Sequence, residues 1–227
     1  MKNLFFLVLI VFGCLNPIDD KNPKLIIAVV VDQMRYDFLE NLNHNFSETG
    51  FKKLIKDGYN FKNNHFNYVP TVTGPGHASI ATGSTPSVNG IVGNDWFNRS
   101  EKREVYCTTD SRYYNLGGNA YYGNKSPKNM KVKSFADLIK TNNNNNSKTI
   151  SISLKDRGAI FMGGPSADAA YWFYGYDKGE IISSSYYFDK LPNWVSDFNK
   201  KIKDEYLKDW NLLLDSADYI GFESDNN

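Results

Sequence analysis

An unbroken apolar run, Leu25 to Val31, constrains the fold of this chain more than any other feature of its 227 residues. A strand that is apolar at every position is buried on both faces, which is typical of the central strands of parallel sheets. Segments with helical and strand patterns alternate along the rest of the chain. We therefore predict an α/β fold with a mainly parallel central sheet flanked by helices.

The N-terminus has the pattern of an export signal. Lys2 precedes the apolar stretch Leu4–Phe12, which is shorter than the roughly 20 residues that cross a bilayer. Cys14 ends a segment similar to a bacterial lipobox, whose cysteine is lipidated after export. We predict a signal peptide over residues 1–14, lipidation of Cys14, and a polar tether over residues 15–23. An ordinary secretory signal and a retained anchor are the alternatives, and all three readings export the chain to the periplasm or a bacterial membrane.

The chain has two cysteines, Cys14 and Cys107. If Cys14 carries lipid, Cys107 has no disulfide partner and is expected to be a buried apolar thiol. A Cys14–Cys107 disulfide is the alternative in an oxidising compartment.

The net charge of the chain limits which partners it can attract. The formal net charge is +1, so no long-range field draws the protein to nucleic acid or to an anionic membrane. We expect no nucleic-acid partner, and membrane contact only through the lipid anchor. A site for an anion must therefore take its positive potential from a few side chains or from metal ions.

Open α/β sheets bind ligands beyond the carboxyl ends of their strands. Three sets of polar residues in this chain follow predicted apolar segments or loops and are therefore candidates for such a site. Asp32 directly follows the first apolar run and is either a carboxylate ligand of a divalent cation or a turn or helix cap. Thr73 lies where a Gly/Pro-rich loop gives way to a helix, so its hydroxyl either faces an anion or caps the helix. Lys155 and Arg157 either bind an oxyanion or belong to a solvated, charged loop.

Several stretches of the chain match the pattern of a known family. They are Val30–Arg35, Tyr68–Thr73, Gly93–Trp96, Val105–Thr108 and Ser153–Arg157. On these stretches the chain resembles the alkaline phosphatase superfamily, specifically the phosphate-irrepressible, PafA-type bacterial alkaline phosphatases. The resemblance implies that residues 24–227 form the N-terminal part of an alkaline-phosphatase-like sandwich that is incomplete at its C-terminus.

The resemblance also implies a role for each candidate residue. Asp32 is expected to bind zinc, and Thr73 to be both the nucleophile and a ligand of the same zinc ion. Asn94 is expected to hydrogen-bond a phosphoryl oxygen, and Lys155 and Arg157 to hold a further one. These roles imply a hydrolase of small phosphate monoesters that works through a phosphothreonine intermediate.

The chain supplies few of the ligands that two zinc ions, implied for the complete protein, would need. A two-zinc site takes about six protein ligands, mostly His and Asp. The histidines of this chain are His44, His65 and His77; we expect His77 to be structural and the other two to be surface or packing residues. The remaining ligands of relatives come from later in a longer chain. We therefore expect this chain to be a fragment that provides ligands for only one zinc ion.

Other functions stay open. A nucleotide pyrophosphatase or phosphodiesterase of the same superfamily shares the Asp, Thr and Asn pattern, although Lys155 and Arg157 favour the monoesterase. A sulfatase would need a Cys or Ser in a Cys/Ser-x-Pro-x-Arg motif, which Thr73–Gly76 does not provide. A catalytically inactive, truncated lipoprotein is the alternative from a different functional class.

We predict that the 227-residue chain, purified by itself, hydrolyses p-nitrophenyl phosphate slowly or not at all in the presence of zinc. One carboxylate and the nucleophile do not complete a zinc site. The release of p-nitrophenol measures the turnover. Robust zinc-dependent turnover that Thr73→Ala removes would contradict this expectation.

Overall fold

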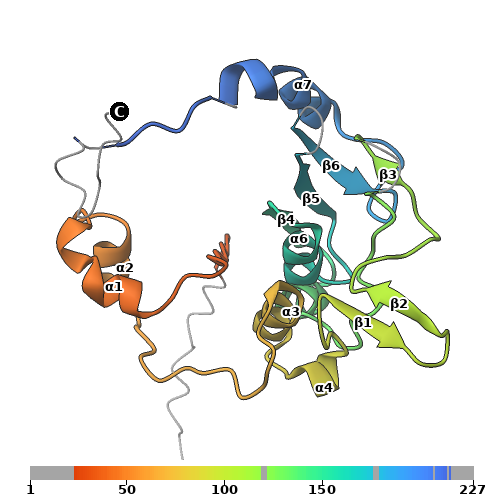
Figure 1. The fold of residues 1–227 in the computed structure, drawn as a ribbon, viewed down its shortest axis with the longest axis horizontal. Helices are drawn as coiled ribbons and strands as arrows, with labels where there is room; N and C mark the ends of the chain where they lie inside the picture. The colour runs from red at the N-terminus through yellow and green to blue at the C-terminus, as the bar shows by residue number, and fades with distance from the viewer. Residues whose placement is uncertain (1–22, 119–121, 176–178, 207, 214, 216–227) are drawn as a thin grey trace, which may run out of the picture. The chain divides into compact units, whose positions relative to one another are not determined.

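The computed structural model describes residues 23–118, 122–175, 179–206, 208–213 and 215 (Figure 1). The chain forms two units, Met1–Arg35 and Tyr36–Asn227. The predicted signal peptide with Cys14, and all of the predicted tether except Pro23, lie outside the described residues. Among the described residues, no helix combines the length and the apolar character that crossing a membrane requires.

In the first unit, the apolar run is an extended segment and not a strand. Leu25, Ile27 and Val29 are mostly exposed, and Asp32 lies in the turn that follows. The predicted central strand is therefore wrong for the described part of the chain. An apolar run expresses a preference for burial, but a strand also needs a partner for its backbone hydrogen bonds, which its own sequence does not specify.

The second unit contains a four-stranded mixed sheet (Figure 1). Its strands lie in the order β3 (Asn115–Leu116), β6 (Glu180–Ser184), β5 (Ala169–Tyr174) and β4 (Ile150–Ser153). Strands β4 and β5 run parallel, whereas the β5–β6 and β6–β3 pairs are antiparallel. The α/β class is confirmed, but the described sheet is mixed and not mainly parallel. Residues 175–179, which join β5 to β6, are too few for a parallel crossover, which takes a dozen residues or more.

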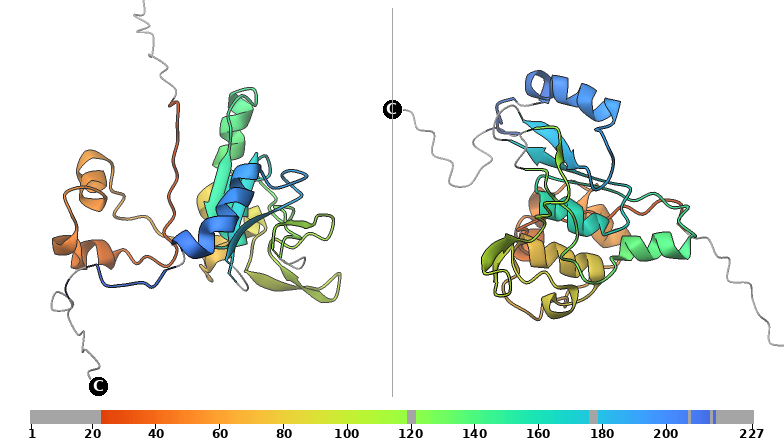
Figure 2. Two further views of the ribbon diagram at one scale, coloured as in Figure 1. Left: turned by 90° about the horizontal axis from the view of Figure 1, so that it is seen from above. Right: turned by 90° about the vertical axis from the view of Figure 1, so that its right-hand side faces the viewer.

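Helices and a hairpin complete the second unit. The hairpin is formed by β1 (Asp95–Asn98) and β2 (Arg103–Tyr106). The helices among the described residues are α1 (Asp37–Asn41), η1 (Asn43–Asn45), α2 (Phe51–Asp57), α3 (Thr73–Thr82), α4 (Pro86–Asn89), α5 (Phe135–Asn142), α6 (Asp156–Gly163), α7 (Asn193–Lys201) and the π-helical η2 (Ile202–Tyr206). Helix α6 packs against β4 and β5, and α3 packs in turn against α6 (Figures 1 and 2).

Both faces of strand β5 are buried. Successive side chains of a strand point to opposite faces of the sheet, so alternate residues of β5 belong to different clusters. Ala170 and Trp172 belong to the main core, together with residues of α3 and α6. Ala169 and Tyr171 belong to a second cluster with Val195 of α7. The sheet therefore carries helical cover on both sides of β5, and α6 is held firmly enough to position the residues at its N-terminus.

A buried carboxylate, Asp110, anchors the loop after β2. Arg112 donates two hydrogen bonds to it, at 2.9 and 2.7 Å, and the hydroxyl of Ser126 donates a third at 2.5 Å. The Asp110 residue is 1% exposed. Burial opposes the charge of this carboxylate, but the hydrogen bonds from Arg112 and Ser126 outweigh burial and lower the pKa of Asp110 to about 2.

This lowered pKa predicts a pH-dependent contribution to stability. A carboxyl whose pKa is depressed in the folded state stabilises the fold above its unfolded-state pKa, and this contribution is lost as the pH falls towards the folded-state pKa. Asp110→Asn should therefore lower the free energy of unfolding near neutral pH by about 2 kcal/mol. It should also flatten the pH dependence between about pH 4 and pH 2.

Urea unfolding at a series of pH values measures both effects. Asp197→Asn is the control, because Asp197 is a solvent-facing carboxylate of α7 paired with Lys200. If the two variants unfolded alike at every pH, the role assigned to Asp110 would be wrong.

Candidate active site

Thr73 is the first residue of α3 and is buried, with 8% of its surface exposed. Val72 takes the N-cap position and no side-chain hydrogen bond caps the helix, so the alternative in which Thr73 is the cap is wrong. The Nζ of Lys155 lies 3.4 Å from the Thr73 Oγ1. The N-terminus of a helix carries partial positive charge, which favours an anion. In the first turn of α3 the Gly74 N–H already donates to Asn94, the Gly76 N–H donates to the Val72 carbonyl oxygen, and Pro75 has no N–H, so the helix acts here mainly through its dipole.

Lys155 and Arg157 lie at the start of α6, where the chain leaves β4. Lys155 occupies the N-cap position and Arg157 lies in the first turn. The Arg157 side chain is 19% exposed, so the alternative of a solvated, charged loop is wrong. Gly158 allows α6 to approach the end of β4, because a Cβ at this position would lie 2.5 Å from the hydroxyl oxygen of Ser153. The β4–α6 junction therefore places the lysine beside α3.

Asn94 is linked to α3 through the residue that follows Thr73. Its Oδ1 accepts a hydrogen bond of 2.8 Å from the backbone N–H of Gly74. The approach depends on a glycine, because a Cβ on Gly74 would lie 3.0 Å from that oxygen. The backbone of Asn94 is held as well, since its carbonyl oxygen accepts from the N–H of Cys107 at 2.8 Å. The structure thus brings Thr73, Asn94 and Lys155 together.

Asp156 joins Arg157 to the hairpin through a hydrogen-bond network that sequence reasoning missed. The Tyr106 hydroxyl donates to Asp156 Oδ1 at 2.6 Å, and the Thr108 hydroxyl donates to Oδ2 at 2.7 Å. One terminal nitrogen of Arg157 donates to the Tyr106 oxygen at 2.8 Å. Lys125 Nζ lies 3.7 Å from Asp156 Oδ2. Tyr106, Thr108 and Asp156 lie in two of the stretches that carry the family resemblance. The contacts themselves join residues 48 and 50 positions apart, which a local pattern does not specify.

Burial changes the ionisation of this region. Burial, together with the neighbouring Asp156, raises the pKa of Tyr106, so its phenol stays protonated and donates to the carboxylate. Burial lowers the pKa of Lys125. Burial also raises the pKa of the Cys107 thiol to about 12. Cys107 is fully buried, which confirms the predicted buried thiol, and such a thiol is unreactive at neutral pH.

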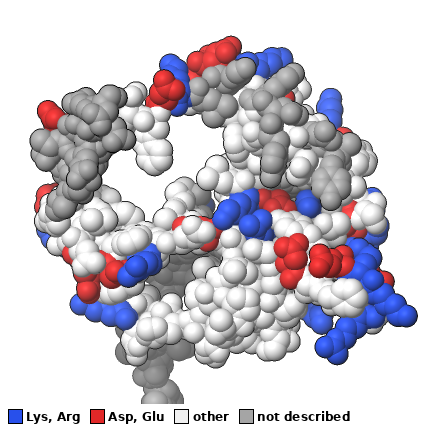
Figure 3. Space-filling model, viewed as in Figure 1, with Lys and Arg blue, Asp and Glu red and all other residues white. Residues whose placement is uncertain are grey.

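Charged side chains of both signs share the face of the molecule in Figure 3. No uniform field of one sign covers that face. Beside Thr73, the Lys155 ammonium and the α3 N-terminus supply positive potential locally.

The histidines take the places that the sequence suggested. The Nδ1 of buried His77 is 2.8 Å from the carbonyl oxygen of Thr73, one turn earlier in the same helix. His65 is exposed and its Nε2 lies 2.9 Å from the side-chain oxygen of Asn63. His44 is exposed in η1.

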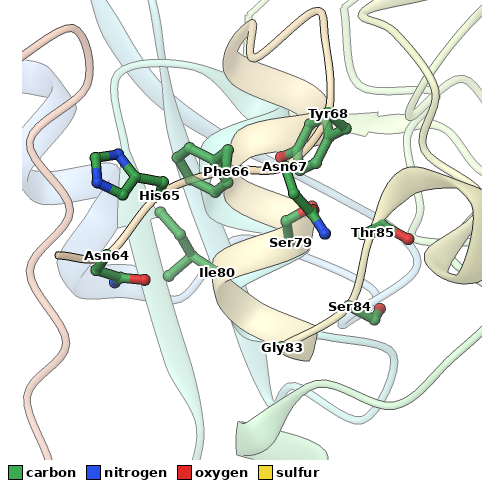
Figure 4. Close-up of a pocket in the computed structure, with 10 residues that line it drawn as sticks. All are labelled: Asn64, His65, Phe66, Asn67, Tyr68, Ser79, Ile80, Gly83, Ser84 and Thr85. Carbon is green, nitrogen blue, oxygen red and sulfur yellow. The ribbon is translucent and has the colours of Figure 1, made fainter.

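A hollow of about 530 Å³ lies on a different part of α3 (Figure 4). Its lining consists of residues 64–68, of Ser79, Ile80 and Gly83 from α3 and its end, and of Ser84 and Thr85. None of the candidate site residues lines it. The hollow and the Thr73 site are therefore separate features of the second unit.

The described residues do not form a complete metal centre. Within them, no group of three or more His, Cys, Asp or Glu side chains is placed to hold a metal ion. The two predicted zinc ligands are Asp32 and Thr73, and Asp32 belongs to the first unit. Zinc sites in proteins use three or four protein ligands, so the described residues do not by themselves fit a zinc ion.

Known proteins resemble this chain over most of its length. Residues 26–224 match the family model described as type I phosphodiesterase / nucleotide pyrophosphatase. The chain is 43% identical to a Myroides odoratus protein named calcium-transporting ATPase, over 91% of this chain and 38% of that protein. It is 42% identical to alkaline phosphatase PhoV of Synechococcus elongatus, over 89% of this chain and 37% of that protein.

Solved structures agree with these relatives. The crystal structure of wild-type alkaline phosphatase PafA matches with a TM-score of 0.79 and 40% identity, over 87% of this chain and 38% of PafA. A PafA variant with one threonine, one asparagine, one lysine and one arginine replaced matches with a TM-score of 0.79 and 38% identity, over 87% of this chain and 39% of that chain. The chain thus spans less than half the length of the relatives that it matches.

The close approach of Asn94 to α3 can be tested with two glycines of the same helix. Gly76→Ala should stabilise the protein by up to about 1 kcal/mol through helix propensity, because its Cβ would meet only the Thr71 carbonyl oxygen, at an ordinary 3.6 Å. Gly74→Ala should lack this gain, because its Cβ would push the Asn94 amide away. Thermal unfolding compares the two variants. Equal stabilisation by both substitutions would show that the Asn94–Gly74 contact is not tight.

Proposed function

The chain belongs to the type I phosphodiesterase / nucleotide pyrophosphatase family, and from this we propose that its second unit carries the phosphoryl-binding side of a phosphate monoester hydrolase site. One observation supports this most directly. The Thr73 hydroxyl lies at the N-terminus of a helix, 3.4 Å from the Lys155 ammonium, and the next residue is bound by Asn94. A hydroxyl, a cation and an amide side chain in this arrangement suit the oxygens of a phosphoryl group.

In the proposed reaction Thr73 is the nucleophile. Its oxygen forms a bond to phosphorus while the bond from phosphorus to the alcohol oxygen of the substrate breaks, and the proton of the Thr73 hydroxyl ends on the departing alcohol. Water then attacks the phosphothreonine, which releases phosphate and restores the hydroxyl. Charge spreads over the non-bridging oxygens in both transition states. Lys155, Arg157, Asn94 and the dipole of α3 stabilise that charge.

Arg157 offers a further sign of a ligand site. Its Nε–H is buried and has no hydrogen-bond acceptor within the described part of the chain. An unsatisfied buried donor costs about 1–3 kcal/mol, and such groups call for a specific explanation. The donor is closed to solvent in this structure, so a phosphoryl oxygen would reach it only after a shift of the surrounding side chains.

The choice of a monoester over a diester depends on the two cations and on the relatives. A terminal phosphate has one more charged oxygen than a diester and makes fuller use of Lys155 and Arg157. The threonine and asparagine replaced in the PafA variant are 21 positions apart, and the lysine and arginine two apart. The same spacings occur in this chain, 21 positions from Thr73 to Asn94 and two from Lys155 to Arg157. A nucleotide pyrophosphatase or phosphodiesterase is the second candidate, supported by the description of the family model.

We propose two zinc ions for the complete protein, because the relatives are alkaline phosphatases, with Thr73 as a ligand of one. A cation bound to the Thr73 oxygen would lower the pKa of the hydroxyl. The remaining ligands are not among the described residues, so no step above depends on the metal.

We further propose that the protein is exported and anchored through a lipid on Cys14, and that small phosphate monoesters are its substrates. The alternative of a catalytically inactive lipoprotein fits the same incomplete ligand set.

We propose that this chain is part of a longer protein, as its relatives are longer, and the proposal predicts a difference between monoesters and diesters in that complete protein. Lys155→Ala should lower kcat/KM for p-nitrophenyl phosphate about a hundredfold, as the loss of one transition-state donor does. It should lower kcat/KM for methyl p-nitrophenyl phosphate much less. Thr73→Ala should abolish turnover of both substrates. Initial rates of p-nitrophenol release provide the measurement.

Lys200→Ala is the matched control, because Lys200 is an exposed lysine of α7 paired with Asp197. It should change neither rate. Equal losses on monoester and diester with Lys155→Ala would favour the phosphodiesterase reading. Full turnover by Thr73→Ala would refute the proposed nucleophile.

A further inference from the structure

We infer that Tyr106 is a positioning residue for Arg157, holding one edge of its guanidinium so that other N–H groups of the same side chain are left for a phosphoryl oxygen. This inference rests on the proposed function, and it concerns a residue whose own atoms need not touch the substrate. Three features of the contacts around Asp156 support it.

The first feature is the direction of the hydrogen bonds at Tyr106. A phenol has one proton to donate and lone pairs to accept. A carboxylate only accepts, so the Tyr106 proton points to Asp156 Oδ1, at 2.6 Å. The phenol oxygen is then oriented to accept from the Arg157 terminal nitrogen, at 2.8 Å. The chain of donors runs in one direction, from the guanidinium through the phenol to the carboxylate.

The second feature is that Asp156 does not form a forked ion pair with its neighbour Arg157. The shortest approach of the two charged groups is 3.7 Å, which is longer than a hydrogen bond. A bidentate pair would occupy two N–H groups of the arginine and leave fewer for a ligand. Here the contact through Tyr106 occupies one N–H, and the buried Nε–H has no acceptor within the described residues.

The third feature is that the carboxylate and the phenol ring are both held in place. Thr108 and Lys125 approach Asp156 Oδ2, at 2.7 and 3.7 Å, so the carboxylate cannot turn towards the arginine without losing them. Lys125 Nζ also lies 4.1 Å from the centroid of the Tyr106 ring, within the range of a cation–π contact. The position of Arg157 is thus set by Tyr106 of the hairpin, by Thr108 of the loop that follows it, and by Lys125, which comes after β3 in the chain.

The experiment has a spectroscopic arm on the 227-residue chain. The Nε–Hε resonance of Arg157 is identified in the ¹⁵N-labelled chain by its absence in Arg157→Lys. Tyr106→Phe removes one hydroxyl and keeps the ring, and it should shift and broaden this resonance. Tyr186→Phe is the matched control, because Tyr186 loses an equivalent hydroxyl that donates to the Pro165 carbonyl at 2.7 Å, and it should leave the resonance in place.

The kinetic arm uses the complete gene product and p-nitrophenyl phosphate. Tyr106→Phe should lower kcat/KM about tenfold, the loss expected when one hydrogen bond to a charged group disappears. In the Arg157→Ala background the same substitution should have almost no effect, because a positioning residue has nothing left to position. A merely structural tyrosine would show the same loss in both backgrounds.

The outcomes separate the inference from the function on which it rests. An unchanged Arg157 resonance, an unchanged kcat/KM, or equal losses in both backgrounds would overturn the role of Tyr106. Turnover that does not depend on Thr73 would overturn the proposed function, and the inference with it. If Tyr106→Phe does not fold, Asp156→Asn replaces it, because removing the charge that orients the phenol should move the same resonance and the same rate.

Discussion

The hydrogen bonds around the Asp156 carboxylate are the constraint on which the candidate site depends. This carboxylate lies in the first turn of α6, where negative charge is favoured by the helix dipole. It accepts from Tyr106 and Thr108, which come from the hairpin and the loop after it. These contacts fix the start of α6 relative to the hairpin, and the residues on either side of Asp156 in the sequence are the two cations of the site.

Packing around β5 gives this arrangement its rigidity. Helix α6 rests on β4 and β5, and the main core includes the fully buried Ile160 and Phe161 of α6. Gly158 removes the side chain that would hold α6 away from the end of β4. Because α3 packs against α6, the threonine at the start of α3 and the lysine at the start of α6 meet. The site is therefore a product of two helix N-termini brought together by one core.

Several sequence-based predictions concern local properties, and these agree with the structure. The α/β class and the buried Cys107 thiol follow from the alternation of short segments and from a single apolar side chain. The strand expected at Leu25–Val31 is absent from the described structure, and the sheet is mixed. Strand pairing and strand direction depend on partners far away in the chain, which a hydrophobic pattern cannot identify.

The sequence by itself determined which residues could carry the chemistry: a threonine after a Gly/Pro-rich loop, a lysine and arginine after an apolar segment, and Asn94 through family resemblance. Only the tertiary structure decided that Thr73 is not a helix cap, that Lys155 lies beside it, and that Tyr106, Thr108 and Lys125 surround Asp156. The physical reason is distance along the chain. Local sequence sets the chemical type and backbone tendency of each residue, whereas contacts between residues tens of positions apart exist only once the core has brought their helices and strands together.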